Sequence, residues 1–252
     1  MEPLLEVKNL TKIFRDRGQA ELTAVKDVSF CLYPRETLAI VGESGSGKST
    51  VAKLIARLLE ADSGEILLEG RDITRAKGKE LKKIYRKFQM VFQSPAGSFD
   101  PRRRLGDGIG ESLRNTGMAK EKVKERVKDL LRQCGLSEEY ARRYPHEVSG
   151  GECQRAAIAR GLAIQPLILI CDEATSALDV TVQRQIVELL AGLQKENGMS
   201  CLFICHDLAL VQQFCDRVLV MQGGSIVEEG TPDEVIMNPR HNYTKSLVDA
   251  VI

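Results

Sequence analysis

Residues 42–50, GESGSGKST, have the types and spacing of a loop that binds phosphate. Glycines let consecutive backbone N–H groups turn inward toward phosphate oxygens, and here they stand at the fixed places of such a loop. Lys48 is placed to reach the β- and γ-phosphates of a nucleotide, and the Ser49 hydroxyl is placed to bind Mg²⁺. The pattern predicts ligand contacts from the whole stretch: Gly42, Glu43, Ser44, Gly45, Ser46, Gly47, Lys48, Ser49 and Thr50.

The sequence on either side of this phosphate loop supports the interpretation. Residues 37–41 form an apolar run typical of a buried strand, and residues 51–60 have helical spacing. A helix N-terminus behind the loop adds partial positive charge beside the phosphates. The alternative is a glycine-rich strand-to-helix turn that binds nothing, and the two flanks favour the phosphate loop over it.

Paired acids follow a second apolar run, at residues 166–171. Asp172 can hold Mg²⁺ through water, and Glu173 can polarise an attacking water, which are two requirements of phosphoryl transfer to water. Acids are also favoured where loops and helices begin, so this pair alone would be interpreted as structural. Its occurrence together with a phosphate loop favours the catalytic interpretation.

Gln93 and His206 complete the candidate catalytic group. Gln93 follows a short apolar strand at residues 90–92, and its amide can reach both Mg²⁺ and water. His206 follows the apolar residues 199–205 and can hydrogen-bond a γ-phosphate oxygen, although a lone histidine is more often structural. Ligands of parallel sheets bind at the carboxyl ends of the strands. We therefore expect both residues to lie with the phosphate loop and the paired acids.

The order of the predicted elements indicates an α/β fold with a phosphate-loop NTPase core. From residue 149 onward, apolar strands alternate with helices, which is typical of a mainly parallel sheet covered on both faces. Residues 4–14 and 23–33 alternate apolar and polar side chains, so we expect an N-terminal antiparallel β subdomain with residues 15–21 as a hairpin loop. Residues 100–146 are mainly helical and indicate an insertion.

We interpret the chain as one domain with three parts. Residues 1–94 and 156–230 form the nucleotide-binding core, residues 95–155 an inserted helical subdomain, and residues 231–252 a C-terminal tail. A length of 252 residues suffices for one large domain. The other helices that we expect are residues 77–88, 105–115, 120–134, 137–144, 180–198 and 208–215, and a Gly-Gly turn is expected at residues 150–151.

Composition restricts the function classes. Lysine and arginine total 36 against 35 aspartates and glutamates, and this balance gives poor support to a protein whose main task is gripping nucleic acid. No apolar run approaches the roughly 20 residues that span a bilayer, and the N-terminus lacks the layout of a secretory signal. The seven cysteines are irregularly spaced, so we expect reduced, mostly buried thiols in a cytosolic protein. Cys201 and Cys205 are a weak metal candidate, because they lie in a predicted buried strand.

Ser149, Gly150 and Gly151 form a second candidate phosphate-binding element. They offer a hydroxyl and free N–H groups at the start of a predicted helix. One nucleotide does not obviously need two such elements in the same chain. The economical interpretation is that this element serves a nucleotide held by another copy or a partner, which predicts a dimer with ATP in its interface.

Residues 148–152, VSGGE, resemble the signature motif of ATP-binding-cassette (ABC) ATPases. With GESGSGKST, Gln93, LILICDE, residues 176–179 and His206, they make a complete family set in family order. The resemblance implies Mg²⁺-dependent ATP hydrolysis by a head-to-tail dimer, with each ATP between the phosphate loop of one subunit and the signature of the other. It also adds two candidate ligand-binding residues, Glu152 and Asp179, and it strengthens a candidate from the residues themselves, Phe14, whose aromatic ring could stack on an adenine face.

The same resemblance implies the partners and the location. The helical insertion would dock on an integral-membrane permease at the cytoplasmic face of the inner membrane, and Gln93 with the segment to about residue 104 would link ATP state to that permease. A substrate-binding protein would take part indirectly, and no nucleic acid would. Phe14 matches the adenine-stacking position; from the residues alone, a core aromatic is an equal alternative. Val148 and Glu152 replace the commoner Leu and Gln of the signature, but Ser149 and the glycines remain.

The C-terminal segment narrows the resemblance. Residues 238–251, NPRHNYTKSLVDAV, and residues 92–102, FQSPAGSFDPR, are similar to segments of ATPases that serve dipeptide, oligopeptide and nickel importers. The alternative for the C-terminal segment is a generic helix. Because peptide and nickel systems share these motifs, the expected cargo is either of the two.

Two further function classes compete with an importer ATPase. A soluble member of the same superfamily that acts on DNA or ribosomes usually has long coiled-coil insertions or two cassettes, and the sequence shows neither. An unrelated phosphate-loop kinase or GTPase leaves residues 149–152 unexplained, and the guanine-reading Asn-Lys-x-Asp pattern is missing from the sequence.

Overall fold

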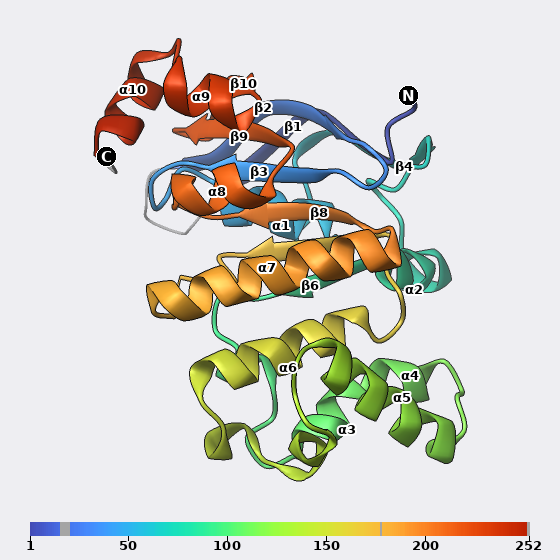
Figure 1. The fold of residues 1–252 in the computed structure, drawn as a ribbon. Coiled ribbons are helices and arrows are strands. Elements are labelled where there is room, and N and C mark those ends of the chain that lie inside the picture. The colour runs from blue at the N-terminus through green and yellow to red at the C-terminus, as the bar shows by residue number, and fades with distance from the viewer. Residues whose placement is uncertain (16–20, 177, 251–252) are drawn as a thin grey trace.

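The computed structural model describes residues 1–15, 21–176 and 178–250. Across these residues the strands form two sheets, which Figure 1 shows stacked in the upper half of the molecule. The N-terminal sheet is antiparallel and has the order β2-β1-β4-β5. Its strands are β1 (Leu5–Phe14), β2 (Leu22–Leu32), β4 (Ser63–Leu68) and β5 (Arg71–Asp72).

The central sheet has the order β10-β9-β3-β8-β7-β6. Its neighbouring strands run parallel, except that β10 pairs with β9 in antiparallel fashion at one edge. Its strands are β3 (Thr37–Val41), β6 (Phe88–Val91), β7 (Ile168–Asp172), β8 (Ser200–Ile204), β9 (Arg217–Gln222) and β10 (Ser225–Gly230). The α/β class and the mainly parallel sheet predicted from the sequence are confirmed.

Alternation of side chains explains the N-terminal sheet. In β2, Val25, Val28, Phe30 and Leu32 are buried, as the alternating pattern predicts for a half-buried strand. The register pairs Leu5 with Leu32 at one end of β1. Of the predicted hairpin loop at residues 15–21, residues 16–20 lie outside the described part of the chain.

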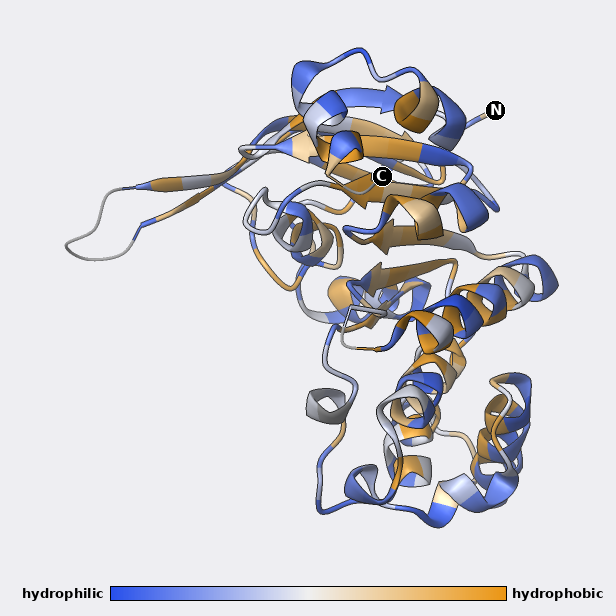
Figure 2. Ribbon diagram, turned by 60° about the vertical axis from the view of Figure 1, so that its left-hand side comes forward, coloured by the Kyte–Doolittle hydropathy of each residue, from blue (hydrophilic) through white to orange (hydrophobic). Residues whose placement is uncertain are grey.

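Helices cover both faces of the central sheet, as Figure 1 shows. The α-helices are α1 (Lys48–Ile55), α2 (Gly78–Lys87), α3 (Leu105–Ile109), α4 (Glu111–Asn115), α5 (Lys120–Gln133), α6 (Gly150–Leu162), α7 (Val180–Asn197), α8 (Leu208–Phe214), α9 (Pro232–Met237) and α10 (Asn242–Asp249). Short 3₁₀ helices are η1 (Ala96–Ser98), η2 (Glu138–Arg142) and η3 (Pro145–Glu147). Figure 2 shows hydrophobic strands at the centre and hydrophilic residues on the outer sides of the surrounding helices.

Successive residues of the central strands face two different hydrophobic clusters. In β3, Leu38 and Ile40 belong to the cluster shared with α1 and the N-terminal sheet, whereas Ala39 and Val41 belong to the cluster shared with α6, α7 and α8. A strand buried on both sides reads as a continuous apolar run, because neither face meets water. This division places α1 and α6 on opposite faces of the central sheet.

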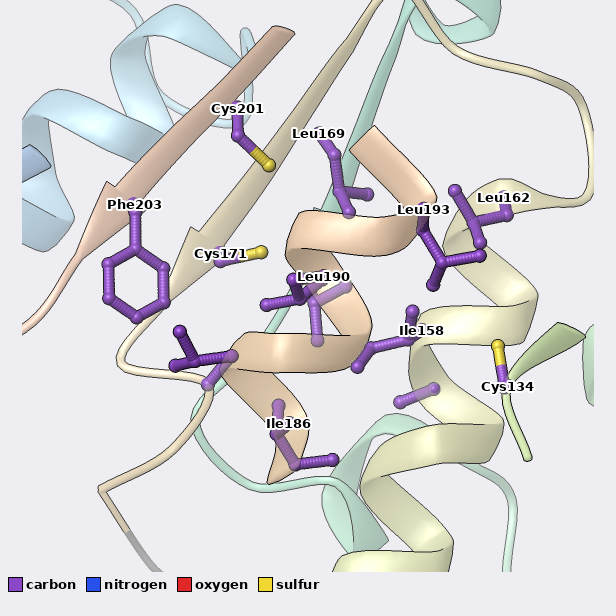
Figure 3. Packing of buried hydrophobic residues seen from close by; sticks show 14 of the residues in the cluster. Cys134, Ile158, Leu162, Leu169, Cys171, Ile186, Leu190, Leu193, Cys201 and Phe203 are labelled. Carbon is purple, nitrogen blue, oxygen red and sulfur yellow. The ribbon is translucent and has the colours of Figure 1, made fainter. Parts of the chain in front are cut away.

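α7 packs between the sheet and part of α6, as Figure 3 shows, while Gly161 of α6 lies directly against Leu169 of β7 and Val91 of β6. Ile186, Leu190 and Leu193 of α7 are each at most 1% exposed. Their side chains lie between the strands β7 and β8 on one side and Ile158 of α6 on the other. Helical spacing of these residues predicts such a buried stripe, and α7 ends where expected, at Gly198 in the left-handed conformation.

Several predicted boundaries are wrong for local physical reasons. The helix expected at residues 77–88 ends at Lys87, because Phe88 is 3% exposed and pairs with Ile168 as the first residue of β6. The strand expected at residues 90–92 therefore starts earlier, and it ends at Val91. The helix after the phosphate loop stops at Ile55 rather than near residue 60.

Glycines account for two other differences. The helix expected at residues 105–115 is divided into α3 and α4 at Gly110, which caps both. Gly150 and Gly151 are not a turn but the first residues of α6. A Cβ on Gly151 would come 2.7 Å from Val182 Cγ1, so close packing against α7 accounts for that glycine. The short helix expected at residues 137–144 is the 3₁₀ helix η2.

The part of the chain described by the structure contains no helix with the length and hydrophobicity needed to cross a membrane. All seven cysteines are free, six are buried, and Cys31 is partly exposed. Within the same residues no group of three or more His, Cys, Asp or Glu side chains is placed to hold a metal ion. Burial raises the pKa of both Cys134 and Cys205 to about 12.

Thiol alkylation tests this arrangement. At about pH 8 in native buffer, iodoacetamide should modify Cys31 first, because the six buried thiols are shielded from the reagent and burial raises the pKa of Cys134 and Cys205 to about 12. Intact mass and peptide mapping read out the sites, and denaturant should make all seven react. Native modification of Cys205 as fast as that of Cys31 would contradict the assigned burial.

Candidate active site

The candidate catalytic residues gather at one edge of the central sheet. Gly42 follows β3 directly, Gln93 comes two residues after β6, Asp172 is the last residue of β7, and His206 comes two residues after β8. Because these four strands run parallel, their carboxyl ends meet at the same edge. The structure thus brings together the strand-end residues that the sequence indicated.

The phosphate loop surrounds the ammonium group of Lys48. Lys48 Nζ donates to the carbonyl oxygens of Gly42 at 2.8 Å and Glu43 at 2.7 Å, and it lies 3.4 Å from Ser46 Oγ. The residue is 4% exposed, and α1 begins with it. Burial lowers the pKa of Lys48, while the nearby carboxylate of Glu173 opposes the shift. Glu43, Ser44 and Gly45 are exposed at the mouth of the loop.

Two glycines of the loop are required by close backbone contacts. Gly42 has a φ of +149° and Gly47 a φ of +104°, conformations that other residues rarely adopt. A Cβ on Gly42 would collide with the carbonyl oxygen of Met221, and one on Gly47 with the carbonyl oxygen of Ala24. The loop is therefore pressed against β9 and β2, which fixes its backbone for ligand binding.

A second contact joins the loop to the end of β7. The Ser49 hydroxyl donates to Asp172 Oδ1 at 2.6 Å. Burial raises the pKa of Asp172, and the hydrogen bond from Ser49 acts against this shift. A hydroxyl and a carboxylate side by side are the hard oxygen ligands that Mg²⁺ prefers, so these two residues fit the predicted metal site.

Glu173 lies beside Asp172 but has different partners. Gln93 Nε2 donates to Glu173 Oε2 at 2.8 Å, and it lies 3.2 Å from Ser176 Oγ. Ser176 Oγ in turn donates to the backbone carbonyl of Glu173 at 3.0 Å. Glu173 has a φ of +48°, an uncommon conformation for a residue with a side chain. Gln93 and Ser176 thus hold the carboxylate and the backbone at this turn.

His206 and Phe14 lie in exposed positions. His206 is placed between β8 and α8, whose N-cap Asp207 accepts a hydrogen bond from the Ala209 N–H at 2.8 Å. Phe14 ends β1 with 37% exposure, and the ammonium group of Lys12 lies 5.6 Å from its ring centroid. This exposure makes the core-aromatic interpretation of Phe14 wrong; its contact with adenine stays a prediction.

The signature segment begins α6. Ser149 is the N-cap, and its hydroxyl and amide both donate to Glu152 Oε2, at 2.9 and 2.8 Å. Glu152 also accepts a hydrogen bond from the Tyr140 hydroxyl, and this bond, with those from Ser149, lowers the pKa of Glu152. A Cβ on Gly150 would touch Leu178 at 3.4 Å, next to Asp179, which caps the start of α7. The signature and Asp179 are therefore neighbours.

Two contacts at the phosphate loop were missed by the sequence analysis. The Gly224 N–H, in the β9–β10 turn, donates to the Ser46 carbonyl at 3.0 Å. The Glu43 N–H donates to the hydroxyl of Tyr243 in α10 at 2.8 Å. These partners stand about 180 and 200 residues from the loop, and the sequence offers no local signal that would pair them.

Comparisons with known proteins agree with this geometry. The family model described as ABC transporter matches residues 25–176. The oligopeptide transport ATP-binding protein OppF of Haemophilus influenzae is 48% identical over 248 residues, covering 98% of this chain and 74% of that protein. The glutathione import ATP-binding protein GsiA of Escherichia coli (strain K12) is 47% identical, covering 99% of this chain and 41% of that protein.

Two solved structures extend the comparison to the fold. The structure of cbiO1 from Clostridium perfringens, part of the ABC transporter complex cbiONQ, has a TM-score of 0.83 at 29% identity and covers 94% of this chain and 92% of its own. A dimeric structure of MJ0796, a bacterial ABC transporter cassette, has a TM-score of 0.83 at 30% identity, with coverages of 90% and 98%. By sequence, fold and family model, this chain belongs to the ABC transporter family, as an ATP-binding subunit that hydrolyses ATP.

Proposed function

We propose that this chain powers a peptide importer from the cytoplasmic face of the membrane, by closing on a second cassette around two ATP molecules. The two cassettes are copies of this chain or homologues. Relatives named for oligopeptide and glutathione transport support a peptide as the cargo rather than nickel. One observation supports the dimer above all: the phosphate loop and the signature, which are the two phosphate-binding elements, are separated within one chain.

That separation follows from the layers of the fold. The phosphate loop leads into α1, which packs on one face of the central sheet, whereas Ser149 begins α6 on the opposite face. Figure 1 shows α6 well below β3 and α1. Ser149 instead lies near Asp179, where α6 and α7 begin, and both residues are exposed. A nucleotide held by the loop would therefore meet the signature of another subunit.

Within one half-site, each residue has a distinct task. The Lys48 ammonium and the N–H groups of the loop neutralise the β- and γ-phosphates, in the space that the exposed residues 43–45 border. Ser49 and Asp172 would hold Mg²⁺, which when bound withdraws charge from the phosphates. Phe14 would support the adenine by stacking.

Glu173, Gln93 and His206 act on the water and the γ-phosphate. The Glu173 carboxylate, held by the amide of Gln93, polarises the attacking water and receives its proton. His206 donates a hydrogen bond to a γ-phosphate oxygen. Because Gln93 also begins the segment that leads into the helical insertion, its contact with Glu173 links the hydrolytic centre to that part of the chain.

Glu173→Gln tests the assignment of the water-polarising group. It should leave ATP affinity near the wild-type value and slow hydrolysis by about 100- to 10,000-fold, because only the general base is lost. It should also trap an ATP-bound dimer, visible by size-exclusion chromatography with ATP. The matched control is Glu188→Gln, the same change on the exposed side of α7. Wild-type turnover by Glu173→Gln would remove Glu173 from this role.

The shared pocket is tested by mixing two inactive variants. Lys48→Ala should abolish nucleotide binding, and Ser149→Arg should block turnover while leaving the ATP affinity of the monomer intact. When equal amounts of the two variants pair at random, half of the dimers contain one copy of each variant. Each such mixed dimer holds one intact pocket, built from the wild-type Lys48 of one copy and the wild-type Ser149 of the other. Hydrolysis should therefore return to as much as about one quarter of the wild-type rate. If each site were built within one chain, the mixture would stay as inactive as its components.

A groove beside Gln93 suits a permease segment. It has a volume of about 410 Å³ and lies between α2 and β6 on one side and α4 on the other. Leu58, Tyr85 and Phe92 line it with exposed fractions of 49%, 36% and 36%, so hydrophobic surface is available for a partner. We propose that a membrane permease docks here, where the core of residues 1–94 and 156–230 meets the helical subdomain of residues 95–155.

Leu58→Asp tests the docking groove. The charge should reduce recovery of permease subunits co-expressed from neighbouring genes at least about 10-fold, because an unpaired carboxylate would be buried in the interface. ATP affinity and the melting temperature should stay unchanged, since Leu58 is half exposed. Leu22→Asp, at a 64% exposed position of β2, is the control. Equal recovery with both variants would place the permease elsewhere.

An ABC-type ATPase that acts on nucleic acid or ribosomes is the second candidate. The balanced net charge of the chain and the apolar groove favour an ATPase that works with a permease over one that acts on nucleic acid. Stimulation of hydrolysis by RNA or DNA, without co-purification of a membrane protein, would favour this candidate instead.

We also propose that residues 231–252 form the C-terminal tail of the domain.

A further inference from the structure

The first peptide unit of the phosphate loop is held from two sides. This unit joins Gly42 to Glu43 and, as a planar group, it fixes its carbonyl and its N–H relative to each other. The Gly42 carbonyl accepts a hydrogen bond from Lys48 Nζ at 2.8 Å, and the Glu43 N–H donates to the Tyr243 hydroxyl at 2.8 Å. Tyr243 therefore restrains the same peptide that holds the Lys48 ammonium.

Tyr243 adds a contact from α10 to the other supports of the loop. Gly42 and Gly47 are fixed by close contacts with the backbones of β9 and β2, and the Ser46 carbonyl is bound by Gly224 in the β9–β10 turn. These contacts come from the two sheets and the turn between β9 and β10, whereas the Glu43 carbonyl is bound from within the loop, by Lys48 Nζ at 2.7 Å and by the Ser46 N–H at 3.2 Å. Glu43, Ser44 and Gly45 are exposed, and the hydroxyl of Tyr243 reaches the first of them from α10.

Tyr243 stands on an anchored helix rather than on a loose end. The Glu228 carboxylate of β10 accepts the N–H groups of Arg240 at 2.8 Å and His241 at 3.0 Å, just before α10 begins. Within the helix, Thr244 is fully buried and Val248 is 7% exposed. The position of the Tyr243 hydroxyl is thus determined by β10, at the same edge strand pair that carries Met221 and Gly224.

We propose that Tyr243 is a positioning residue for nucleotide binding, through which the C-terminal helix orients the first peptide of the phosphate loop and, with it, Lys48. The inference rests on the proposed role of the loop in holding ATP. Without the hydroxyl, the peptide between Gly42 and Glu43 can rotate. ATP binding must then also order this peptide, which reduces the net free energy of binding. ATP affinity falls, whereas the groups that act on the water are unchanged.

Tyr243→Phe tests this role by removing one oxygen atom. A hydrogen bond of ordinary strength predicts that the Kd and the KM for ATP rise about 3- to 10-fold, with kcat within about twofold of wild type. The Kd is measured with a non-hydrolysable ATP analogue by calorimetry, and the melting temperature without nucleotide is measured in parallel. The matched control is Tyr33→Phe, whose ring packs under the guanidinium of Arg217, away from the loop.

The outcomes separate this inference from the proposed function. If wild-type protein binds no nucleotide, the proposed function fails. If wild-type protein binds ATP and Tyr243→Phe matches Tyr33→Phe in Kd and KM, only the positioning role is overturned. A lower melting temperature with an unchanged Kd would show that the Tyr243 hydroxyl is merely structural, and it would overturn the inference as well.

A second variant tests whether the helix transmits the effect. Glu228→Ala removes the acceptor that anchors the start of α10, so it should raise the Kd for ATP by a similar factor although Glu228 does not touch the loop. In the double variant, loss of the Tyr243 hydroxyl should add less than about twofold, because the helix is already displaced. Fully multiplicative effects of the two changes would contradict a shared path from β10 to the loop.

Discussion

Burial of the Lys48 ammonium group is the interaction on which the active-site edge depends. A charge that is 4% exposed is tolerated only where hydrogen bonds replace the lost water, and the carbonyls of Gly42 and Glu43 supply them. Those carbonyls can point inward because the loop backbone turns through conformations open to glycine. The same turn lets the Ser46 N–H donate to the Glu43 carbonyl at 3.2 Å, so one backbone path both holds the cation and closes on itself.

The central sheet explains why the proposed pocket needs two cassettes. Each strand sends alternate side chains into two hydrophobic clusters, so helices must cover both faces. The phosphate loop is continuous with a helix on one face, and the signature begins a helix on the other. A small movement cannot bring the phosphate loop and the signature together, because such a movement would expose the side chains that α7 buries against the sheet, such as Leu190. The proposed pairing with a second cassette keeps this core intact.

The sequence predicted those features that depend on local pattern or on a general rule of parallel sheets. Gln93, Asp172 and His206 were assigned because each follows an apolar run, and parallel topology brings such positions to one edge. Boundaries failed where tertiary contacts outweigh periodicity, as at Phe88, which leaves a helical pattern to pair with β7. The contact of Tyr243 with the loop had no signal at all, because it depends on how β10 and α10 pack 200 residues downstream.

The backbone at the end of β7 explains how two successive acids have different partners. Side chains of successive strand residues point to opposite faces, so in a continued strand Glu173 would point away from the site that Asp172 faces. The left-handed conformation of Glu173 ends the strand and turns its carboxylate toward Gln93, while Asp172 stays on Ser49. Such a conformation costs about 1–3 kcal/mol in a residue that is not glycine. Ser176 and Gln93 offset that cost with hydrogen bonds to the same residue, so the turn keeps the two carboxylates apart, as the proposed division between metal binding and water activation requires.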